Sequence, residues 1–269
     1  ALLSFHPTFV GYDVSHATND IVLLADCSAS MRGDALQDLK RTLHLCINQI
    51  EAMWRSGIMT RFNLLSFGSM FQYLFPRSRL VDSTSLQAAR QYIHVMTASL
   101  GGTDMAQALR AVLMRHSAIS QAAESSPIKN NNNNIVLISD GAFTDMDEIH
   151  ELVQRHRTHH SSRIFTFGVG PEANRHSLAS MARFGGGACE FIECGTLATS
   201  RVTRQFKRIQ QPGLCNIKLA WQVDDADKVI QAPATIESLY NGERKLVYGL
   251  VGNGICTHAT LSAMLSSGR

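Results

Sequence analysis

The stretch that decides the fold is Asp20-Ile21-Val22-Leu23-Leu24-Ala25-Asp26-Cys27-Ser28-Ala29-Ser30, an apolar run that ends abruptly in the pattern DxSxS. The run is too short to cross a membrane and too uniformly apolar for a surface strand, so it predicts a buried parallel strand. Its polar end then lies at the carboxyl edge of the sheet, where open α/β folds bind ligands. The sequence therefore predicts a ligand site, most simply a metal site, at the end of this strand.

Two further segments are predicted to bring oxygen atoms to the same edge. Gly101-Gly102-Thr103-Asp104 precedes a helical pattern, and Asp140-Gly141 closes the apolar run from Ile135 to Ser139. Mg²⁺ takes six oxygen ligands and usually keeps several waters, so hydroxyls with one or two carboxylates are a sufficient set. Hydroxyl ligands are neutral, so such a cation can still accept a carboxylate from another molecule. The simpler alternative is that Ser28 and Ser30 only cap the next helix.

One ordered set of residues resembles a known family site: Asp26, Ser28 and Ser30, then Thr103, then Asp140. This order is similar to the metal-ion-dependent adhesion site of von Willebrand factor A domains, and the resemblance runs from about Asp20 to Arg208. It implies that the two serines and Thr103 are direct or near-direct ligands of Mg²⁺, with Mn²⁺ or Ca²⁺ as alternatives. It also implies that Asp26 and Asp140 act mainly through water. The ordinary role of Asp104 is at the start of a helix, and the alternative is that it adds negative charge in the outer shell of the ion.

The resemblance narrows toward the C-terminus. The segments that carry it are Phe167 to Gly170, Asn174 to His176, Gly185 to Gly187 and Glu190-Phe191. They look like the group that joins a VIT domain to an A domain, which includes the inter-alpha-trypsin inhibitor heavy chains and vault poly(ADP-ribose) polymerase. The region from Gln231 to Leu261 is most similar to the segment after the A domain of the vault polymerase. This implies a β-rich collar beside the A domain.

Alternation of strand and helix patterns predicts a mostly parallel, doubly wound α/β sheet with helices on both faces, over residues 20–211. Strands are predicted at Ile21 to Ala25, Arg61 to Phe67, Phe71 to Phe75 as an antiparallel edge, Ile135 to Ser139, Ile164 to Gly168 and Ala188 to Ile192. Helices are predicted at Ala35 to Trp54, Ser85 to Met96, Met105 to Met114, Asp147 to Arg157 and Arg175 to Phe184, before a last basic helix. The polar tract from Ser117 to Asn134 is predicted to be a surface loop.

After Pro212-Gly213 the pattern changes to that of an antiparallel β unit over residues 212–269. Its predicted strands are Cys215 to Val223, Ala234 to Tyr240, Arg244 to Val251 and Thr257 to Leu265. Residues 1–19 are expected to add a strand at Leu2 to His6 and then a linker. The two ends of the chain would therefore meet in one small domain.

Composition sets the limits of the functional reading. A chain of 269 residues with 45% hydrophobic content can bury a full core. The net charge of +3 gives no electrostatic argument for nucleic acid, and the absence of a run of 18 apolar residues gives none for a membrane. Six irregularly spaced cysteines and no secretory signal favour an intracellular, cytoplasmic setting. A secreted setting is the alternative if a longer parent resembles the inhibitor heavy chains.

Four other motifs have simpler explanations. Arg32-Gly33-Asp34 spells the adhesive tripeptide, but Asp34 is a natural helix cap. Gly168 to Ala173 fits a GxGxxA dinucleotide pattern with Glu193 further on, but Pro171 removes an amide that a pyrophosphate would need. The histidines at 156, 159 and 160 lack a second metal-ligating cluster. The basic stripe of the last helix, formed by Arg201, Arg204, Lys207 and Arg208, is usually a solvated face.

Three functional hypotheses follow. The first is a non-enzymatic module that captures an Asp or Glu of a protein partner through a divalent metal. The second is a docking segment of a larger vault-type ADP-ribosyltransferase, within a ribonucleoprotein or multi-subunit assembly, whose catalytic domain lies outside this chain. The third is a structural spacer that binds no metal. No direct contact with nucleic acid or membrane is expected under any of them.

Overall fold

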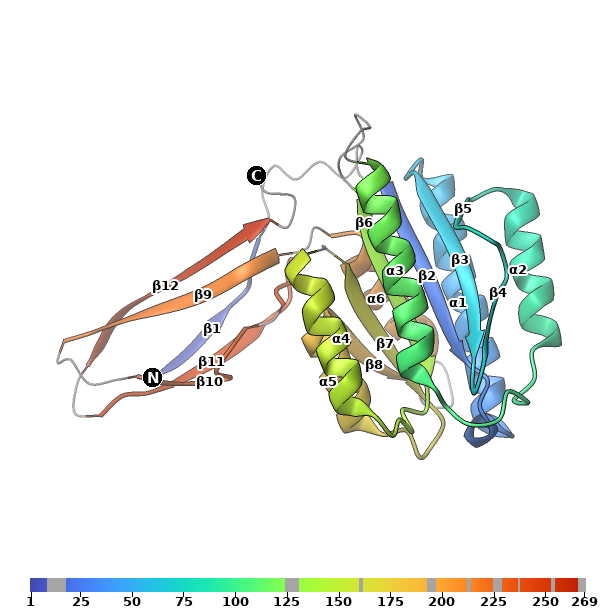
Figure 1. Cartoon of the computed structure of the whole chain (residues 1–269). Helices are drawn as coiled ribbons and strands as arrows, with labels where there is room; N and C mark the ends of the chain where they lie inside the picture. The colour runs from blue at the N-terminus through green and yellow to red at the C-terminus, as the bar shows by residue number, and fades with distance from the viewer. Residues whose placement is uncertain are drawn as a thin grey trace. The chain divides into compact units, whose positions relative to one another are not determined.

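The computed structural model describes residues 1–8, 18–123, 131–159, 162–192, 197–211, 214–224, 229–236, 238–252 and 255–265. The chain divides into two compact units (Figure 1). The larger unit is formed by residues 14–210, and the smaller unit by residues 1–13 together with 211–269. The larger unit is therefore inserted into the chain of the smaller one.

The larger unit contains a seven-stranded sheet with the order β4-β3-β2-β6-β7-β8, and β5 pairs beside β3. Its strands are β2 (Thr18–Asp26), β3 (Thr60–Phe67), β4 (Phe71–Tyr73), β5 (Arg79–Leu80), β6 (Asn131–Ser139), β7 (Arg163–Val169) and β8 (Gly186–Ile192). The pairs between β3, β2, β6, β7 and β8 are parallel, while β4 and β5 run antiparallel to β3. The predicted wound sheet and its antiparallel edge are confirmed.

Helices cover both faces of this sheet (Figure 1). They are α1 (Asp34–Arg55), α2 (Ser83–Val95), α3 (Met105–Ala123), α4 (Met146–His159), α5 (Arg175–Phe184) and α6 (Leu197–Ile209), with a 3₁₀ turn at Ala29–Met31. Helices α3, α4 and α5 bury apolar side chains against Val22, Leu24 and Leu137 on one face. Helix α1 packs against α2 and α6 on the other face. Strand β2 is buried along its whole length because helices cover both of its sides.

The predicted surface loop from Ser117 to Asn134 was wrong at both of its ends. Helix α3 continues to Ala123, and β6 already begins at Asn131, while residues 124–130 lie outside the described part. Asparagine has a low strand propensity, but here the pairing of β6 with β2 determines that these asparagines form a strand. The registers Thr18 to Asn131 and Ile21 to Asn134 give the asparagine backbone a ladder to join, and Asn134 is fully buried.

The basic stripe of α6 is only partly a solvated face. Arg204 donates two hydrogen bonds to the carboxylate of Glu190 on β8, and Arg208 donates a third at 2.7 Å. Arg201 donates to the carbonyl of Phe191. Burial acts to raise the pKa of Glu190, but the two arginines outweigh it and hold that pKa below its usual value. The arginines therefore fasten α6 to the edge strand of the sheet.

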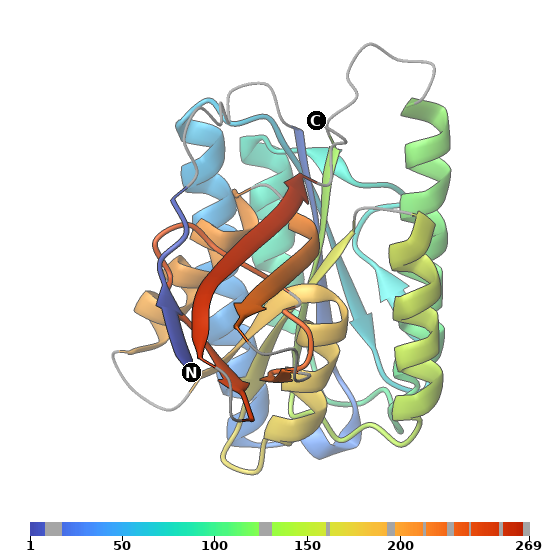
Figure 2. The ribbon, with the colours of Figure 1, turned by 90° about the vertical axis from the view of Figure 1, so that its left-hand side faces the viewer.

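The smaller unit consists of two antiparallel sheets, β1-β11-β10 and β9-β12. The strands are β1 (Leu2–Phe5), β9 (Leu214–Val223), β10 (Ile230–Ala232), β11 (Lys245–Leu250) and β12 (Cys256–Leu265), and β9 and β12 lie side by side in Figure 2. The predicted strand from Ala234 to Tyr240 was wrong, because the described residues of that segment form none. Ile236 and Leu239 instead pack with Val247 in the core. Their apolar pattern therefore reflects burial in the core and not pairing with another strand.

Candidate metal site

Asp26 is the last residue of β2 and its side chain is fully buried. Its Oδ1 accepts the backbone N–H of Ser28 at 3.0 Å, and its Oδ2 accepts the hydroxyl of Ser139 at 2.5 Å. Burial raises the pKa of Asp26, the hydrogen bonds from Ser139 and Ser28 act to lower it, and the nearby charge of Asp140 acts to raise it. The loop after β2 thus holds one carboxylate oxygen, and the end of β6 holds the other.

Ser28 and Ser30 do not cap a helix. Their hydroxyl oxygens lie 3.0 Å from each other. Ser28 precedes the 3₁₀ turn without a side-chain capping bond, and the N-cap of α1 is Gly33, which has no side chain to offer. The expected cap by Asp34 was also wrong, because Asp34 is the first residue inside α1. The capping alternative therefore does not explain why the loop carries two hydroxyls.

The loop that carries Thr103 is fastened to the loop that follows β2. The amide of Ala29 donates to the carbonyl of Gly101 at 2.8 Å, and the amide of Leu100 donates to the carbonyl of Cys27 at 3.0 Å. Gly101 has a φ of +74°, a backbone conformation that residues other than glycine rarely adopt. These backbone bonds bring the DxSxS and GGTD segments together, as the sequence predicted.

The loop after β3 holds the same segment from its other side. The hydroxyl of Ser69 accepts the amide of Gly102 at 2.8 Å, and the carbonyl of Gly68 accepts the amide of Asp104 at 2.9 Å. A Cβ on Gly68 would lie 2.5 Å from the Cβ of Leu100. The backbone of the loop after β3 therefore packs directly against the side chain of Leu100. Sequence reasoning missed Gly68 and Ser69, because no motif connects them with Thr103.

Asp140 follows β6 at the edge where β2 also ends. Its Oδ1 accepts the amide of Ala142 at 3.0 Å, and its carbonyl accepts the amide of Asn174 at 2.7 Å. Its negative charge acts on the pKa of Asp26, which places the two carboxylates in one electrostatic environment. Asp104, by contrast, caps α3, since its Oδ1 accepts the amide of Gln107 at 2.9 Å.

The donor set fits a small hard cation. Neighbouring ligands around an octahedral ion with metal–oxygen distances of about 2.1 Å lie about 3.0 Å apart. The hydroxyl oxygens of Ser28 and Ser30, which hydrogen-bond to each other, have this separation. In the part of the chain that the structure describes, no three His, Cys, Asp or Glu side chains are grouped so that they could hold a metal. A metal site at this edge would therefore depend on hydroxyl ligands.

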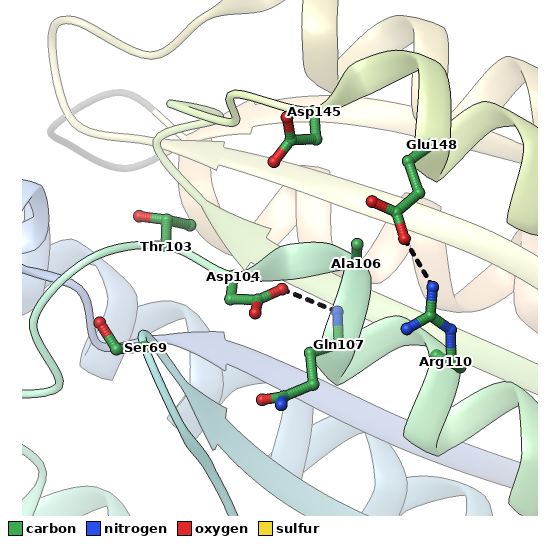
Figure 3. Close-up of a pocket in the computed structure, with 8 residues that line it drawn as sticks. All are labelled: Ser69, Thr103, Asp104, Ala106, Gln107, Arg110, Asp145 and Glu148. Carbon is green, nitrogen blue, oxygen red and sulfur yellow. Dashed lines mark hydrogen bonds and ion pairs between the residues drawn. The ribbon is translucent and has the colours of Figure 1, made fainter.

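A polar pocket of about 470 Å³ opens beside the loop that carries Thr103. Figure 3 shows its walls, which come from the loop after β3 and from the starts of α3 and α4. Its lining includes three carboxylates, those of Asp104, Asp145 and Glu148, and one arginine, Arg110. Arg110 is paired with Glu148 at 2.5 Å, so the pocket carries an excess of negative charge.

Within the described residues, the other candidate groups are not brought together into a second metal site. Cys27 is buried, and burial together with the Asp26 charge raises the pKa of its thiol to about 12, so it stays protonated at neutral pH. The imidazole Nε2 of His156 lies 2.9 Å from the Ser162 hydroxyl. The side chain of His159, the whole of His160 and Glu193 lie outside the described residues.

Comparison with known proteins identifies similar chains. A family model described as von Willebrand factor type A domain matches residues 19–191. A von Willebrand factor A domain-containing protein of Dictyostelium discoideum is 28% identical over 247 residues, which cover 91% of this chain and 24% of that protein. Human protein mono-ADP-ribosyltransferase PARP4 is 29% identical over 251 residues, which cover 92% of this chain and 13% of that protein. The chain thus spans a quarter or less of these relatives, and the predicted family resemblance is confirmed.

Solved structures share the fold. A von Willebrand factor type A protein from Catenulispora acidiphila aligns with a TM-score of 0.63 at 12% identity, over 98% of this chain and 67% of that one. The manganese-loaded TRAP protein of Plasmodium vivax aligns with a TM-score of 0.51 at 15% identity, over 98% of this chain and 97% of that one. Among the helices that the structure describes, none is both long and apolar enough for a membrane span.

Proposed function

This chain belongs to the von Willebrand factor type A domain family, and from that premise we propose that it is a non-enzymatic module that binds an Asp or Glu of a protein partner. Domains of this family are typically protein-interaction modules. The residues proposed to hold a divalent cation, Mg²⁺ with Mn²⁺ or Ca²⁺ as alternatives, are Asp26, Ser28, Ser30, Thr103 and Asp140. When bound, the cation would supply a positive charge with a coordination position for the partner's carboxylate.

The observation that carries this proposal is the pair of hydroxyls on Ser28 and Ser30. They lie at the spacing of two neighbouring ligands and have no capping role. Asp26 keeps their loop in shape through its bond to the Ser28 amide. Since hydroxyls bring no negative charge, the two aspartates are the only acids of the proposed set. Because the two aspartates are expected to act mainly through water, a partner's carboxylate would be the negatively charged group in direct contact with the cation.

The pocket beside Thr103 indicates what else the partner carries. Its three carboxylates against one arginine disfavour a second acidic group on the partner and favour a basic one. We therefore expect a partner segment in which the bound acid has a Lys or Arg close by. Because these pocket charges are exposed, they should affect the association rate and its salt dependence more than the final affinity.

Calorimetric titration tests the proposal directly. Wild type should bind Mg²⁺ or Mn²⁺, Ser30→Ala should weaken binding at least about tenfold, and Asp26→Asn about 100-fold or more. Asp82→Asn is the matched control, since Asp82 caps α2 and Asn is an equally good cap. A pull-down with and without chelator should then show that partner capture needs both the cation and Asp26, because each ligand raises the affinity of the other by the same factor. A wild-type chain without divalent-ion binding would leave the spacer hypothesis.

A second candidate function rests on the coverage of the relatives. The chain matches only 13% of PARP4 and 24% of the Dictyostelium protein. We propose that it serves as the docking segment of a longer protein, for example a vault-type ADP-ribosyltransferase whose catalytic part lies elsewhere. Deletion of residues 20–211 from such a parent should then abolish its assembly into a larger complex and leave its transferase activity in place. Loss of activity with assembly intact would contradict this candidate.

A further inference from the structure

One buried hydroxyl joins the two halves of the proposed site. Ser139 is the last residue of β6 and is fully buried. Its Oγ lies 2.5 Å from Oδ2 of Asp26 and 2.9 Å from the backbone nitrogen of Gly141. An amide N–H can only donate, so the hydroxyl accepts from Gly141 and directs its single proton to Asp26. The two bonds therefore fix the orientation of the hydroxyl completely.

The result is a continuous chain of hydrogen bonds across the site. The loop with the two serines holds Oδ1 of Asp26, and Ser139 holds Oδ2. Through Gly141, the same hydroxyl fixes the turn that carries Asp140. Asp26 is thus the junction of two loops, and Ser139 is the residue through which the second loop reaches it.

The turn after Ser139 has little freedom to replace these bonds. Gly141 has a φ of +77°, and a Cβ there would lie 2.8 Å from Cγ of Leu178 and 3.0 Å from the carbonyl oxygen of Asn174. The amide of Asn174 also holds the carbonyl of Asp140. A turn packed this closely against α5 cannot shift far to find another partner for the Gly141 amide.

We propose that Ser139 is a positioning residue of the cation site, which sets the distance between the Asp26 and Asp140 carboxylates although it need not touch the ion. This inference rests on the proposed function. Groups that hydrogen-bond to metal ligands commonly change metal affinity 10-fold to 100-fold when they are removed. Ser139 should act in this way because both of its bonds end on residues that carry, or lie next to, the proposed ligands.

The experiment compares Ser139→Ala and Ser139→Thr with Ser66→Ala by titration with Mn²⁺ and Mg²⁺. Ser66 is the matched control. It is a buried serine at the carboxyl end of β3, as Ser139 is at the carboxyl end of β6, and its hydroxyl forms a hydrogen bond of 2.7 Å with the hydroxyl of Tyr92. Ser139→Ala should weaken cation binding about 10-fold to 100-fold. Ser139→Thr keeps a hydroxyl and should restore binding to within about threefold, and Ser66→Ala should stay within about twofold of wild type.

A second readout needs no metal. In the metal-free protein, amide hydrogen exchange at Gly141 should become faster in Ser139→Ala and return toward wild type in Ser139→Thr. If Ser139→Ala does not fold, Ser139→Cys takes its place, because the thiol is a weak donor of similar size.

Two outcomes would overturn the inference. If Ser139→Ala binds the cation as tightly as wild type, the inference that Ser139 positions the site is wrong, while the proposed function stands. Equal losses in Ser139→Ala and Ser66→Ala would show a general packing effect. No binding by wild type would instead end the proposed function, so the two failures can be told apart.

Discussion

The two ends of β2 carry aspartates in opposite situations. Asp26 at the carboxyl end and Asp20 near the amino end are both buried, with 0% and 2% of their surface exposed. Asp26 receives hydrogen bonds on both oxygens, from Ser28 and Ser139. Within the described residues, neither oxygen of Asp20 has a hydrogen bond of ordinary geometry. Burial raises the pKa of Asp20, and only Ser78 and the charge of Arg61 act against this.

The difference shows that burial of an acid does not by itself mark a site. At the carboxyl edge, an N–H and an O–H are directed at Asp26 and act to lower its pKa, which burial nevertheless keeps raised. At the amino edge, the neighbour of Asp20 in sequence is Asn19, which is also fully buried without a hydrogen bond to its side chain from the described residues. Burial disfavours the charged form in both places, but only Asp26 has hydrogen bonds on both oxygens that offset part of this cost.

The largest effect is expected from Asp26→Ala. The change leaves the Ser28 amide and the Ser139 hydroxyl unpaired in a buried place, at a cost of about 2–4 kcal/mol in unfolding free energy. Urea unfolding at pH 7 in the absence of metal measures it. A loss smaller than about 0.5 kcal/mol would mean that the two hydrogen bonds do not distinguish Asp26 from Asp20.

Asp20→Asn should have the opposite sign and a smaller size. It removes a buried charge that has no hydrogen bond of ordinary geometry from the described residues, and should stabilise the protein by about 1 kcal/mol at pH 7. The pKa of Asp20 is raised above 3.8 in the folded state. The folded state therefore binds more protons than the unfolded state at pH values between 3.8 and this raised pKa. Wild type therefore gains stability as the pH falls through this range, and the advantage of Asp20→Asn should shrink as the pH is lowered from 7 toward 3.8.

A control for this titration is already in the chain. Asp26 also has a raised pKa, but it is present in both proteins, so the difference between wild type and Asp20→Asn isolates Asp20. An advantage of the variant that is independent of pH would show that packing, and not the charge, is responsible.

The smallest effect is expected from Ser78→Ala. Ser78 is a group that favours the ionised form of Asp20, so its loss should raise the pKa of Asp20 further and lower stability at pH 7 by about 0.5 kcal/mol. The effect should largely vanish in the Asp20→Asn background. A double-mutant cycle by urea unfolding tests this, and full additivity of the two changes would contradict the link between them.

The wound sheet could be predicted because its signals are local. The apolar run before Asp26 and the helical spacing over α1 and α5 each mark one element, and α5 was predicted at its observed bounds. Elements that depend on a partner were missed. The asparagines at the start of β6 form a strand only because β2 lies beside them, and the segment from Ala234 to Tyr240 packs in a core without joining a ladder.

The candidate site shows the same division. The DxSxS, Thr103 and Asp140 positions could be placed at one sheet edge from their order in the chain. Ser139 could not be recognised, because in the sequence it is only the polar end of an apolar run. Its role depends on a contact across 113 positions, from β6 to the end of β2. Ser69 is similar, since its bond to Gly102 exists only once two loops have folded against each other.

The insertion of the larger unit into the smaller one has a mechanical consequence. Residues 1–13 and 211–269 belong to one unit, and β1 pairs with β11 over four registered positions from Leu2 to Phe5. Strand β1, which precedes the wound sheet in the chain, and strand β9, which follows it, thus belong to the same small β unit. A pulling force applied at the two ends of this chain would first be borne by the β1 and β11 ladder, and the loops of the proposed cation site would carry tension only after that ladder had separated.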